Sequence, residues 1–161
     1  MRRVYEIKGR DLTKPLLLLI PDVESLSPLV KRISIRARRL MEAFWPGPLT
    51  LVFQASESVP RVCLGGGNTV AVRLPNSSVA LALLREVAAP VTASSANPSG
   101  GPQPTSAGVV ASHLGNLVDL IVDGGPCEDD RPSTLVDVTG SQPVVLRPGR
   151  ISEETLKPFL S

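Results

Sequence analysis

Small polar residues follow a short apolar run at Val91–Ala93, and they are the residues of this chain best suited to chemistry. The run is typical of a buried strand, and residues 94–101 after it combine hydroxyl, amide and glycine groups: Ser94, Ser95, Asn97, Ser99, Gly100 and Gly101. The glycines allow the backbone to bend and to approach a ligand closely. Ligands of open α/β sheets bind where strands end, so we expect a binding loop here. A plain connection between a strand and a helix is the alternative, because most clusters of this composition are only loops.

Cationic residues lie at the ends of other apolar runs. Lys8 and Arg10 are one residue apart, which on an extended segment would place both side chains on the same side. Arg73 is the one charged residue of its apolar run, and it needs a carboxylate or a ligand as its partner. Arg147 ends another run, and Ser133 begins a third. Each could belong to a solvent-exposed strand end or to a salt bridge, but together they favour binding of a phosphate or a carboxylate.

The sequence lacks the usual motifs of covalent and metal catalysis. Residues 65–69 do not continue into the Lys-Ser/Thr pair of a Walker A motif, and no GxGxxG follows a strand. The single histidine, His113, is expected on the surface, so a His-rich zinc site is excluded and a Ser-His-Asp triad is not expected. Cys63 and Cys127 are expected to be unreactive. A site of scattered cations and hydroxyls acts by positioning and charge neutralisation, as adenylyl transfer requires, so no residue is assigned a catalytic role.

Composition indicates one globular domain in a reducing compartment. The chain has 161 residues, of which 42% are hydrophobic and 20% charged, and its net charge is +2. That size allows a real core, and the mildly basic balance suits a phosphate-bearing ligand without requiring nucleic acid. Two distant cysteines do not make a disulfide framework. We find no signal peptide and no apolar run long enough to span a bilayer, so we expect a soluble, cytoplasmic protein without membrane contact.

Strand and helix patterns alternate along the chain. Proline and glycine bound most of the apolar runs, and serines or threonines precede the helical patterns. The expected strands are at residues 4–7, 16–20, 49–53, 69–74, 91–93, 117–122, 135–138 and 144–146. The expected helices are near residues 28–32 and 34–44, from Ser77 or Ser78 to 87, from Thr105 or Ser106 to 114, and from Ser152 onward. Short strands mixed with such helices predict a single α/β domain with a twisted mixed sheet over residues 1–161.

Basic residues also gather in the first two of these helices. The cluster consists of Lys31, Arg32, Arg36, Arg38 and Arg39. Three of these side chains, Arg32, Arg36 and Arg39, share one helical face. The cluster is typical of a solvated face, and the functional alternative is contact with the phosphate backbone of RNA.

An ordered set of short motifs resembles the YrdC family of threonylcarbamoyl-AMP synthases over nearly the whole chain. No single motif is decisive, but their order is specific. They are Lys8-Gly9-Arg10 with Lys14-Pro15-Leu16, Trp45-Pro46-Gly47-Pro48-Leu49-Thr50, Val70-Ala71-Val72-Arg73-Leu74-Pro75, Ser95-Ala96-Asn97-Pro98-Ser99-Gly100, Pro132-Ser133-Thr134 and Leu146-Arg147-Pro148-Gly149.

The resemblance implies a YrdC/RibB-like fold and a reaction of L-threonine, bicarbonate and ATP that gives threonylcarbamoyl-adenylate and pyrophosphate. The product would serve threonylcarbamoyladenosine formation in tRNA, through downstream threonylcarbamoyl transferase proteins, and Mg²⁺ would accompany ATP. No protein-held metal site is expected. The residues that would line the ATP site are Lys8, Arg10, Lys14, Thr69, Ser95, Asn97 and Arg147. Those on the threonine side would be Arg73, Ala93 and Ser133.

Two departures from the family pattern lead to further expectations. The family's usual opening segment, with a Pro-Thr-Asp/Glu-Thr-x-Tyr-Gly-Leu pattern ahead of the KxR motif, is not found before Lys8. We therefore expect an N-terminally truncated, partial domain with an open cavity and weak or no synthase activity alone. In the loop at 127–132, Asp130 and Arg131 replace an expected small residue, which would alter the lid over threonine.

Two other functions remain open from the sequence. One is a related carbamoyl-adenylate-forming enzyme, as in YrdC-like modules of longer chains. The other is a non-catalytic module that binds tRNA or double-stranded RNA through the basic cavity and the basic helix.

Overall fold

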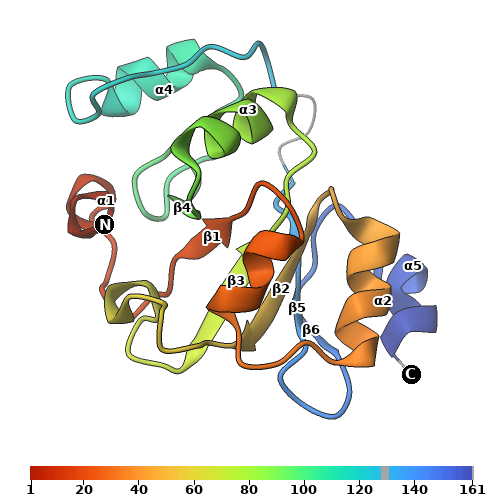
Figure 1. Cartoon of the computed structure of the whole chain (residues 1–161). Coiled ribbons are helices and arrows are strands. Elements are labelled where there is room, and N and C mark those ends of the chain that lie inside the picture. The colour runs from red at the N-terminus through yellow and green to blue at the C-terminus, as the bar shows by residue number, and fades with distance from the viewer. Residues whose placement is uncertain (128–130, 161) are drawn as a thin grey trace.

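The molecule is built on a six-stranded mixed sheet (Figure 1). The structure, a computed structural model, describes residues 1–127 and 131–160. The strands lie in the order β4-β1-β3-β2-β5-β6, with β1 parallel to β3, β2 parallel to β5, and the other neighbours antiparallel. Their bounds are β1 Leu17–Leu19, β2 Leu49–Gln54, β3 Thr69–Arg73, β4 Val91–Ala93, β5 Thr134–Asp137 and β6 Val144–Arg147. The expected single α/β domain with a mixed sheet is confirmed.

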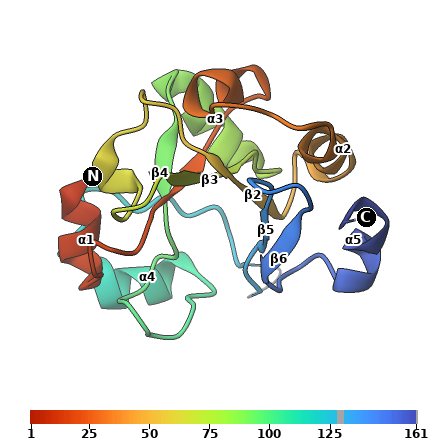
Figure 2. The same cartoon turned by 90° about the horizontal axis from the view of Figure 1, so that it is seen from below.

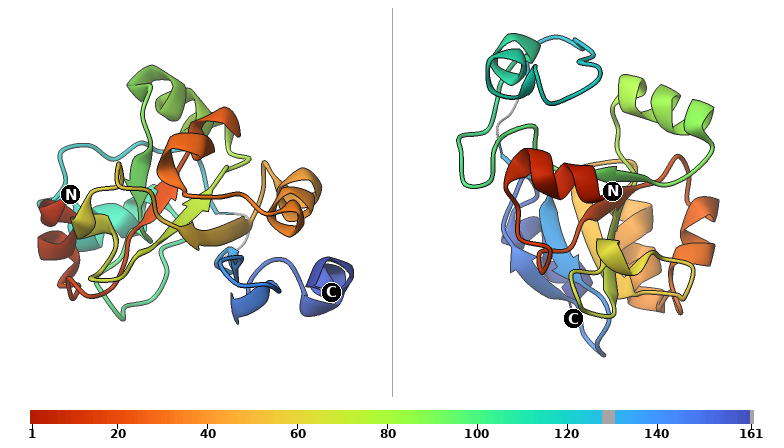
Figure 3. Two further views of the ribbon diagram at one scale, coloured as in Figure 1. Left: turned by 60° about the horizontal axis from the view of Figure 1, so that its bottom comes forward. Right: turned by 90° about the vertical axis from the view of Figure 1, so that its left-hand side faces the viewer.

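Helices flank both sides of this sheet. They are α1 Arg2–Lys8, η1 Glu24–Leu29, α2 Ile35–Phe44, η2 Arg61–Cys63, α3 Ser78–Val87, α4 Ala107–Leu114 and α5 Glu153–Leu160. Figure 2 shows α2 and α3 on one side of the sheet, and α1 and α4 on the other. In the left view of Figure 3, α2 and α5 lie at the end of the molecule opposite α1. Of the helices within the described residues, none is long and apolar enough to cross a membrane.

One face of the sheet carries the main core. Alternate residues of the strands point to the same face, and those that face α2 are large, apolar and almost fully buried. They include Leu18, Leu51, Phe53, Val70, Val72 and Val136. Leu26, Leu40 and Leu156 pack against them from the flanking helices. The core is therefore aliphatic, as the scarcity of aromatic residues predicts.

Serine side chains begin several of the helices, Ser152 at the start of α5 among them. Ser34, Ser77 and Ser106 each accept a hydrogen bond from the backbone N–H three residues later, at 3.1, 3.3 and 3.4 Å. Such caps satisfy N–H groups that have no partner inside the helix. The expected helices after these residues are confirmed. The short helix expected near residues 28–32 is instead the 3₁₀ turn η1, which ends at Leu29 and includes Pro28.

The strand expected at residues 4–7 is wrong, because these residues form helix α1. Four residues of alternating polarity are too few to define a period, and Val4 and Ile7 also share a helical face at the spacing i, i+3. Tertiary contact decides between the two: Tyr5 is 3% exposed, and its hydroxyl lies 3.1 Å from the Lys14 carbonyl oxygen and 2.9 Å from that of Val62. The helix ends at Gly9, whose φ of 57° suits glycine.

The strand expected at residues 117–122 is also wrong. Leu117 and Val118 donate their backbone N–H groups to the Leu114 carbonyl, so the segment begins as a turn that continues from α4. Arg3 of α1 binds the segment through the Leu117 carbonyl, at 3.1 Å. Leu120 is 77% exposed, and no ladder includes it. An apolar run needs a neighbouring strand to become part of a sheet, and none in the described chain lies beside this one.

Candidate active site

The second face of the sheet, opposite the core, gathers several of the expected site residues. In β3, Thr69 and Arg73 alternate with the buried Val70 and Val72, so both point away from the core. The register places Ala93 of β4 on the same face, because Leu17 pairs with both Ala71 and Ala93. Thr69 and Arg73 lie at opposite ends of this strand, roughly 13 Å apart at about 3.3 Å per residue. The second face therefore offers two separated ends at which charged groups could bind.

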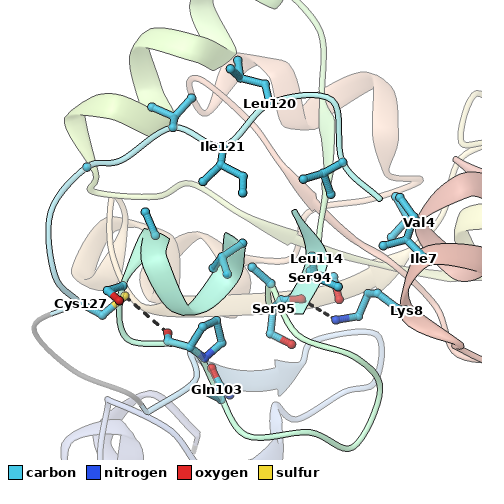
Figure 4. A pocket seen from close by; sticks show the side chains of 18 of the residues that line it. Val4, Ile7, Lys8, Ser94, Ser95, Gln103, Leu114, Leu120, Ile121 and Cys127 are labelled. Carbon is cyan, nitrogen blue, oxygen red and sulfur yellow. Dashed lines mark hydrogen bonds between the residues drawn. The ribbon is translucent and has the colours of Figure 1, made fainter. Parts of the chain in front are cut away.

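The 94–101 loop (residues 94–101) lies at one end of this face, directly after β4. Lys8 reaches it from α1 and donates to the carbonyl oxygens of Ser95 and Asn97, both at 2.5 Å, and to Asn97 Oδ1 at 3.3 Å. Asn97 is 5% exposed, and its Nδ2 donates to the Gly101 carbonyl at 2.6 Å. Figure 4 shows the ammonium group of Lys8 beside Ser95. Lys8 therefore holds the loop in a defined conformation.

Arg10 and Lys14 follow α1 and differ in their surroundings. Lys8 ends a helix and Gly9 turns the chain, so Lys8 and Arg10 do not share one side of an extended segment as expected. Arg10 donates from Nη2 to the Pro15 carbonyl at 3.0 Å, and its Nε is buried without a hydrogen-bond partner. Lys14 is exposed. Both residues precede β1, whose start lies beside the end of β4.

Ser133 lies near the other end of the sheet, within a group that we call the Ser133 cluster: Thr50, Ser133 and Arg147. The hydroxyls of Thr50 and Ser133 are 2.7 Å apart. Arg147 Nη2 donates to the Ser133 carbonyl at 2.8 Å and to its hydroxyl at 3.3 Å. Thr50 and Ser133 are 2% and 7% exposed. The expected ATP ligand Arg147 therefore contacts the expected threonine ligand Ser133, rather than the 94–101 loop.

Three of the site's cations are partly withdrawn from water. Burial lowers the pKa of Arg73, and the positive charge of Arg150 lowers it further. Burial also lowers the pKa of Arg147, and of Lys8, where Arg10 adds to the effect. Arg73 Nε donates to the Gly47 carbonyl at 2.8 Å. Within residues 1–127 and 131–160, none of these three cations pairs with a carboxylate. An anionic ligand would therefore offset the free-energy cost of withdrawing them from water.

A cavity of about 630 Å³ lies beside the 94–101 loop (Figure 4). Lys8 and Ser95 line it at one side, and its remaining wall is largely apolar. The apolar wall comes from α1, from α4 and from the segment after α4; it includes Val4, Ile7, Val110, Leu114, Leu120 and Ile121. Sequence reasoning missed this cavity because its lining residues belong to segments that were expected to be strands or an ordinary helix.

Thr50 and Gly149 are further site residues that sequence reasoning did not assign. Thr50 is the polar residue among the five buried residues of β2, and a buried hydroxyl requires a partner; this signal was available. Gly149 touches the backbone of residues 132–134 so closely that a Cβ atom would lie 2.4 Å from the Pro132 carbonyl oxygen. The expectation for the loop at 127–132 falls partly on residues 128–130, which lie outside the described residues.

Replacing Thr50 by valine should destabilise the protein by about 1–2 kcal/mol, because the buried Ser133 hydroxyl loses the shorter of its two hydrogen bonds while the side-chain volume is kept. Thermal denaturation should report a decrease in Tm of roughly 2–8 °C. Thr105→Val is the matched control, since Thr105 is exposed and its hydroxyl makes no hydrogen bond within the described chain. An equal Tm for Thr50→Val and the unchanged protein would contradict the role of this contact.

Known proteins are similar to this chain in sequence and in fold. Residues 1–149 match the model of the Sua5/YciO/YrdC family, which carries the description telomere recombination. The threonylcarbamoyl-AMP synthase of Pyrococcus abyssi is 45% identical over 157 residues, which make up 98% of this chain and 46% of that protein. The crystal structure of P. abyssi Sua5 complexed with L-threonine has a TM-score of 0.96 at 44% identity, covering 99% of this chain and 47% of that one.

The E. coli YciO crystal structure has a TM-score of 0.87 at 30% identity and covers 99% of this chain and 76% of that one. The chain spans about half the length of the synthases from P. abyssi and Bacillus subtilis, 46% of each. The match to the family nevertheless includes every strand of the sheet and all the expected site residues. The chain belongs to the Sua5/YciO/YrdC family.

Proposed function

We propose that this chain forms threonylcarbamoyl-AMP and pyrophosphate from L-threonine, bicarbonate and ATP. The observation that carries the proposal is the arrangement of anion-binding groups at two ends of one sheet face. The 94–101 loop lies at one end, and Arg73 with the Ser133 cluster lies at the other. The phosphates of a nucleotide and the carboxylate of an amino acid are two anionic groups that such a face could hold side by side. The P. abyssi relatives, a synthase by name and a structure complexed with L-threonine, support this assignment.

The nucleotide would lie against the 94–101 loop. The Ser95 side chain is exposed there, and Arg10 and Lys14 bring two positive charges to the same end of the sheet. Cations and N–H groups suit phosphate oxygens. The residues proposed to form or support the ATP site are Lys8, Arg10, Lys14, Thr69, Ser95, Asn97 and Arg147. Arg147 bonds Ser133, so it would neutralise charge where the two substrates meet.

L-threonine would lie at the other end of the face. The Arg73 guanidinium uses Nε for the Gly47 carbonyl, which leaves its terminal N–H groups to bind the substrate carboxylate. Ser133 would present its hydroxyl near the amino acid, and the small side chain of Ala93, level with Ala71 in the middle of β3, would leave room on the face between the two ends. These three residues are the proposed threonine site.

The chemistry would consist of positioning and charge neutralisation. The threonine amine and bicarbonate condense to a carbamate with loss of water. A carbamate oxygen then bonds to the α-phosphorus of ATP while the bond from that phosphorus to the pyrophosphate oxygen breaks. Cations aimed at the phosphates neutralise the charge that develops on the leaving pyrophosphate, and bound geometry replaces a random encounter.

Mg²⁺ would enter this site with ATP. Magnesium commonly binds substrate phosphates and water together with few protein ligands. Among the described residues there is no cluster of three or more His, Cys, Asp or Glu side chains that could hold a metal by itself. The hydroxyl of Ser95 is the kind of neutral oxygen that could complete such a shell, and when bound the ion would neutralise phosphate charge.

Pyrophosphate release measured with ATP, L-threonine and bicarbonate tests the proposal, and threonylcarbamoyl-AMP should be detected as the product by mass spectrometry. Omission of either threonine or bicarbonate should abolish release. Release without threonine would favour the related carbamoyl-adenylate enzyme. No release, combined with salt-sensitive binding of tRNA or double-stranded RNA, would favour the RNA-binding module.

RNA contact would use the basic cluster if that alternative holds. Lys31 and Arg32 precede α2, so Arg32 does not share a helical face with Arg36 and Arg39 as expected. Lys31, Arg32, Arg36, Arg38 and Arg39 are all exposed, as phosphate-backbone binding requires. Under the synthase proposal, the product would instead pass to a separate threonylcarbamoyl transferase that modifies tRNA.

A further inference from the structure

The ammonium group of Lys8 is fully occupied by the protein itself. A lysine ammonium has three N–H donors, and three acceptors surround Nζ: the Ser95 carbonyl, the Asn97 carbonyl and Asn97 Oδ1. Lys8 is 6% exposed, although it belongs to a residue type that is seldom buried without a partner. No donor remains for a phosphate unless the present contacts break.

A backbone contact reinforces this attachment. The Ser99 N–H donates to the Lys8 carbonyl at 2.8 Å, so residue 8 holds the 94–101 loop through both its side chain and its main chain. Asn97 Nδ2 closes the loop onto Gly101. Tyr5, one turn earlier in α1, ties the helix to the body of the protein through the Lys14 and Val62 carbonyls. The loop is therefore anchored by a chain of contacts that leads from the core to Asn97.

We propose that Lys8 is a positioning residue for the nucleotide site and does not bind the phosphates directly. By drawing the Ser95 and Asn97 carbonyls toward α1, Lys8 leaves the Ser95 hydroxyl, which makes no hydrogen bond within residues 1–127 and 131–160, on the open side of the loop. The phosphates then meet that hydroxyl together with Lys14 and Arg10. This inference rests on the proposed function for the identity of the ligand, but the attachment of the loop does not depend on it.

Lys8→Met should loosen the loop in the nucleotide-free protein. Methionine keeps the length of the side chain but leaves the Ser95 and Asn97 carbonyls and Asn97 Oδ1 without their donor, which is costly. Hydrogen–deuterium exchange at the Ser99 and Gly101 amides should become at least about 10-fold faster, because local opening of the loop requires less free energy. Lys14→Met is the matched control: it removes the same charge from an exposed lysine, and exchange in the loop should not change.

Ligand binding then separates positioning from a purely structural role. Lys8→Met should raise the Kd for ATP at least about 10-fold, with the Kd for L-threonine unchanged. If Lys8→Met loses ATP affinity while hydrogen–deuterium exchange in the loop of the free protein is unchanged, Lys8 binds the phosphates directly and the proposal is overturned. Faster exchange with unchanged ATP affinity would overturn it as well, because the loop's geometry would then not matter for the nucleotide.

Lys8→Arg keeps the charge and serves as a second variant if Lys8→Met does not fold. The larger guanidinium does not fit the three acceptors around the buried Nζ, so positioning predicts faster exchange and weaker ATP binding in this variant too. A direct ligand role predicts that ATP affinity is largely retained, which would contradict the proposal. If the unchanged protein binds no ATP, the proposed function fails, whereas the exchange measurement still decides whether Lys8 holds the loop.

Discussion

Arg73→Ala is expected to raise the Kd of the chain for L-threonine by about 30-fold or more. Removing one partner of a buried, hydrogen-bonded charge pair costs about 2–5 kcal/mol, and each 1.4 kcal/mol corresponds to a factor of about ten. Arg73 meets the conditions for such an effect, since it is half-buried at the end of β3 and pairs with no carboxylate of the described chain. Isothermal titration with L-threonine measures the change directly.

Two variants make the Arg73 result interpretable. Arg73→Lys retains the charge but not the planar fork that binds a carboxylate through two N–H groups, so its affinity should lie between those of Arg73→Ala and the unchanged protein. Arg39→Ala removes an exposed arginine of α2 and should leave threonine binding unchanged. Because Arg73 Nε also binds the Gly47 carbonyl, the Tm of each variant must be compared. An unchanged Kd for Arg73→Ala in a folded protein would remove Arg73 from the threonine site.

Gly149→Ala is expected to damage both stability and the Ser133 cluster. A Cβ atom at this position would lie 2.4 Å from the Pro132 carbonyl oxygen, 2.5 Å from the Thr134 nitrogen and 2.6 Å from the Ser133 carbonyl carbon. All three are backbone atoms, so the start of β5 has to move. Overpacking of this kind costs about 1–3 kcal/mol, which corresponds to a decrease in Tm of roughly 2–12 °C.

The same displacement should weaken threonine binding. Moving residues 132–134 lengthens the contact of 2.7 Å between Thr50 and Ser133 and the contact of 2.8 Å between Arg147 and the Ser133 carbonyl. Gly140→Ala is the matched control, because its Cβ atom would come no closer than 3.7 Å to any neighbouring atom. Differential scanning calorimetry and threonine titration of both variants test the prediction; equal Tm values for the two would contradict it.

Local sequence patterns predicted the elements whose signals are themselves local. Ser77 and Ser106 were among the expected helix starts, because a cap bonds an N–H group only three residues away. The strands β1, β2, β3 and β4 were found from apolar runs bounded by proline, glycine or polar residues. The wrong predictions at residues 4–7 and 117–122 share one cause, which is contact between residues that are distant in sequence. Tyr5 bonds the Val62 carbonyl, and Arg3 bonds the Leu117 carbonyl.

The sequence by itself determined the types of group at the site, and the tertiary structure decided which of them meet. Scattered cations and hydroxyls without a nucleophile were enough to predict an anion-binding loop at residues 94–101 and a charge-neutralising site. Two contacts could not be predicted from sequence spacing. Lys8 holds this loop although it lies 87 residues from Ser95, and Thr50 bonds Ser133 although 83 residues separate them. Such contacts follow from strand order and register, which are set by packing of the whole core rather than by neighbouring residues.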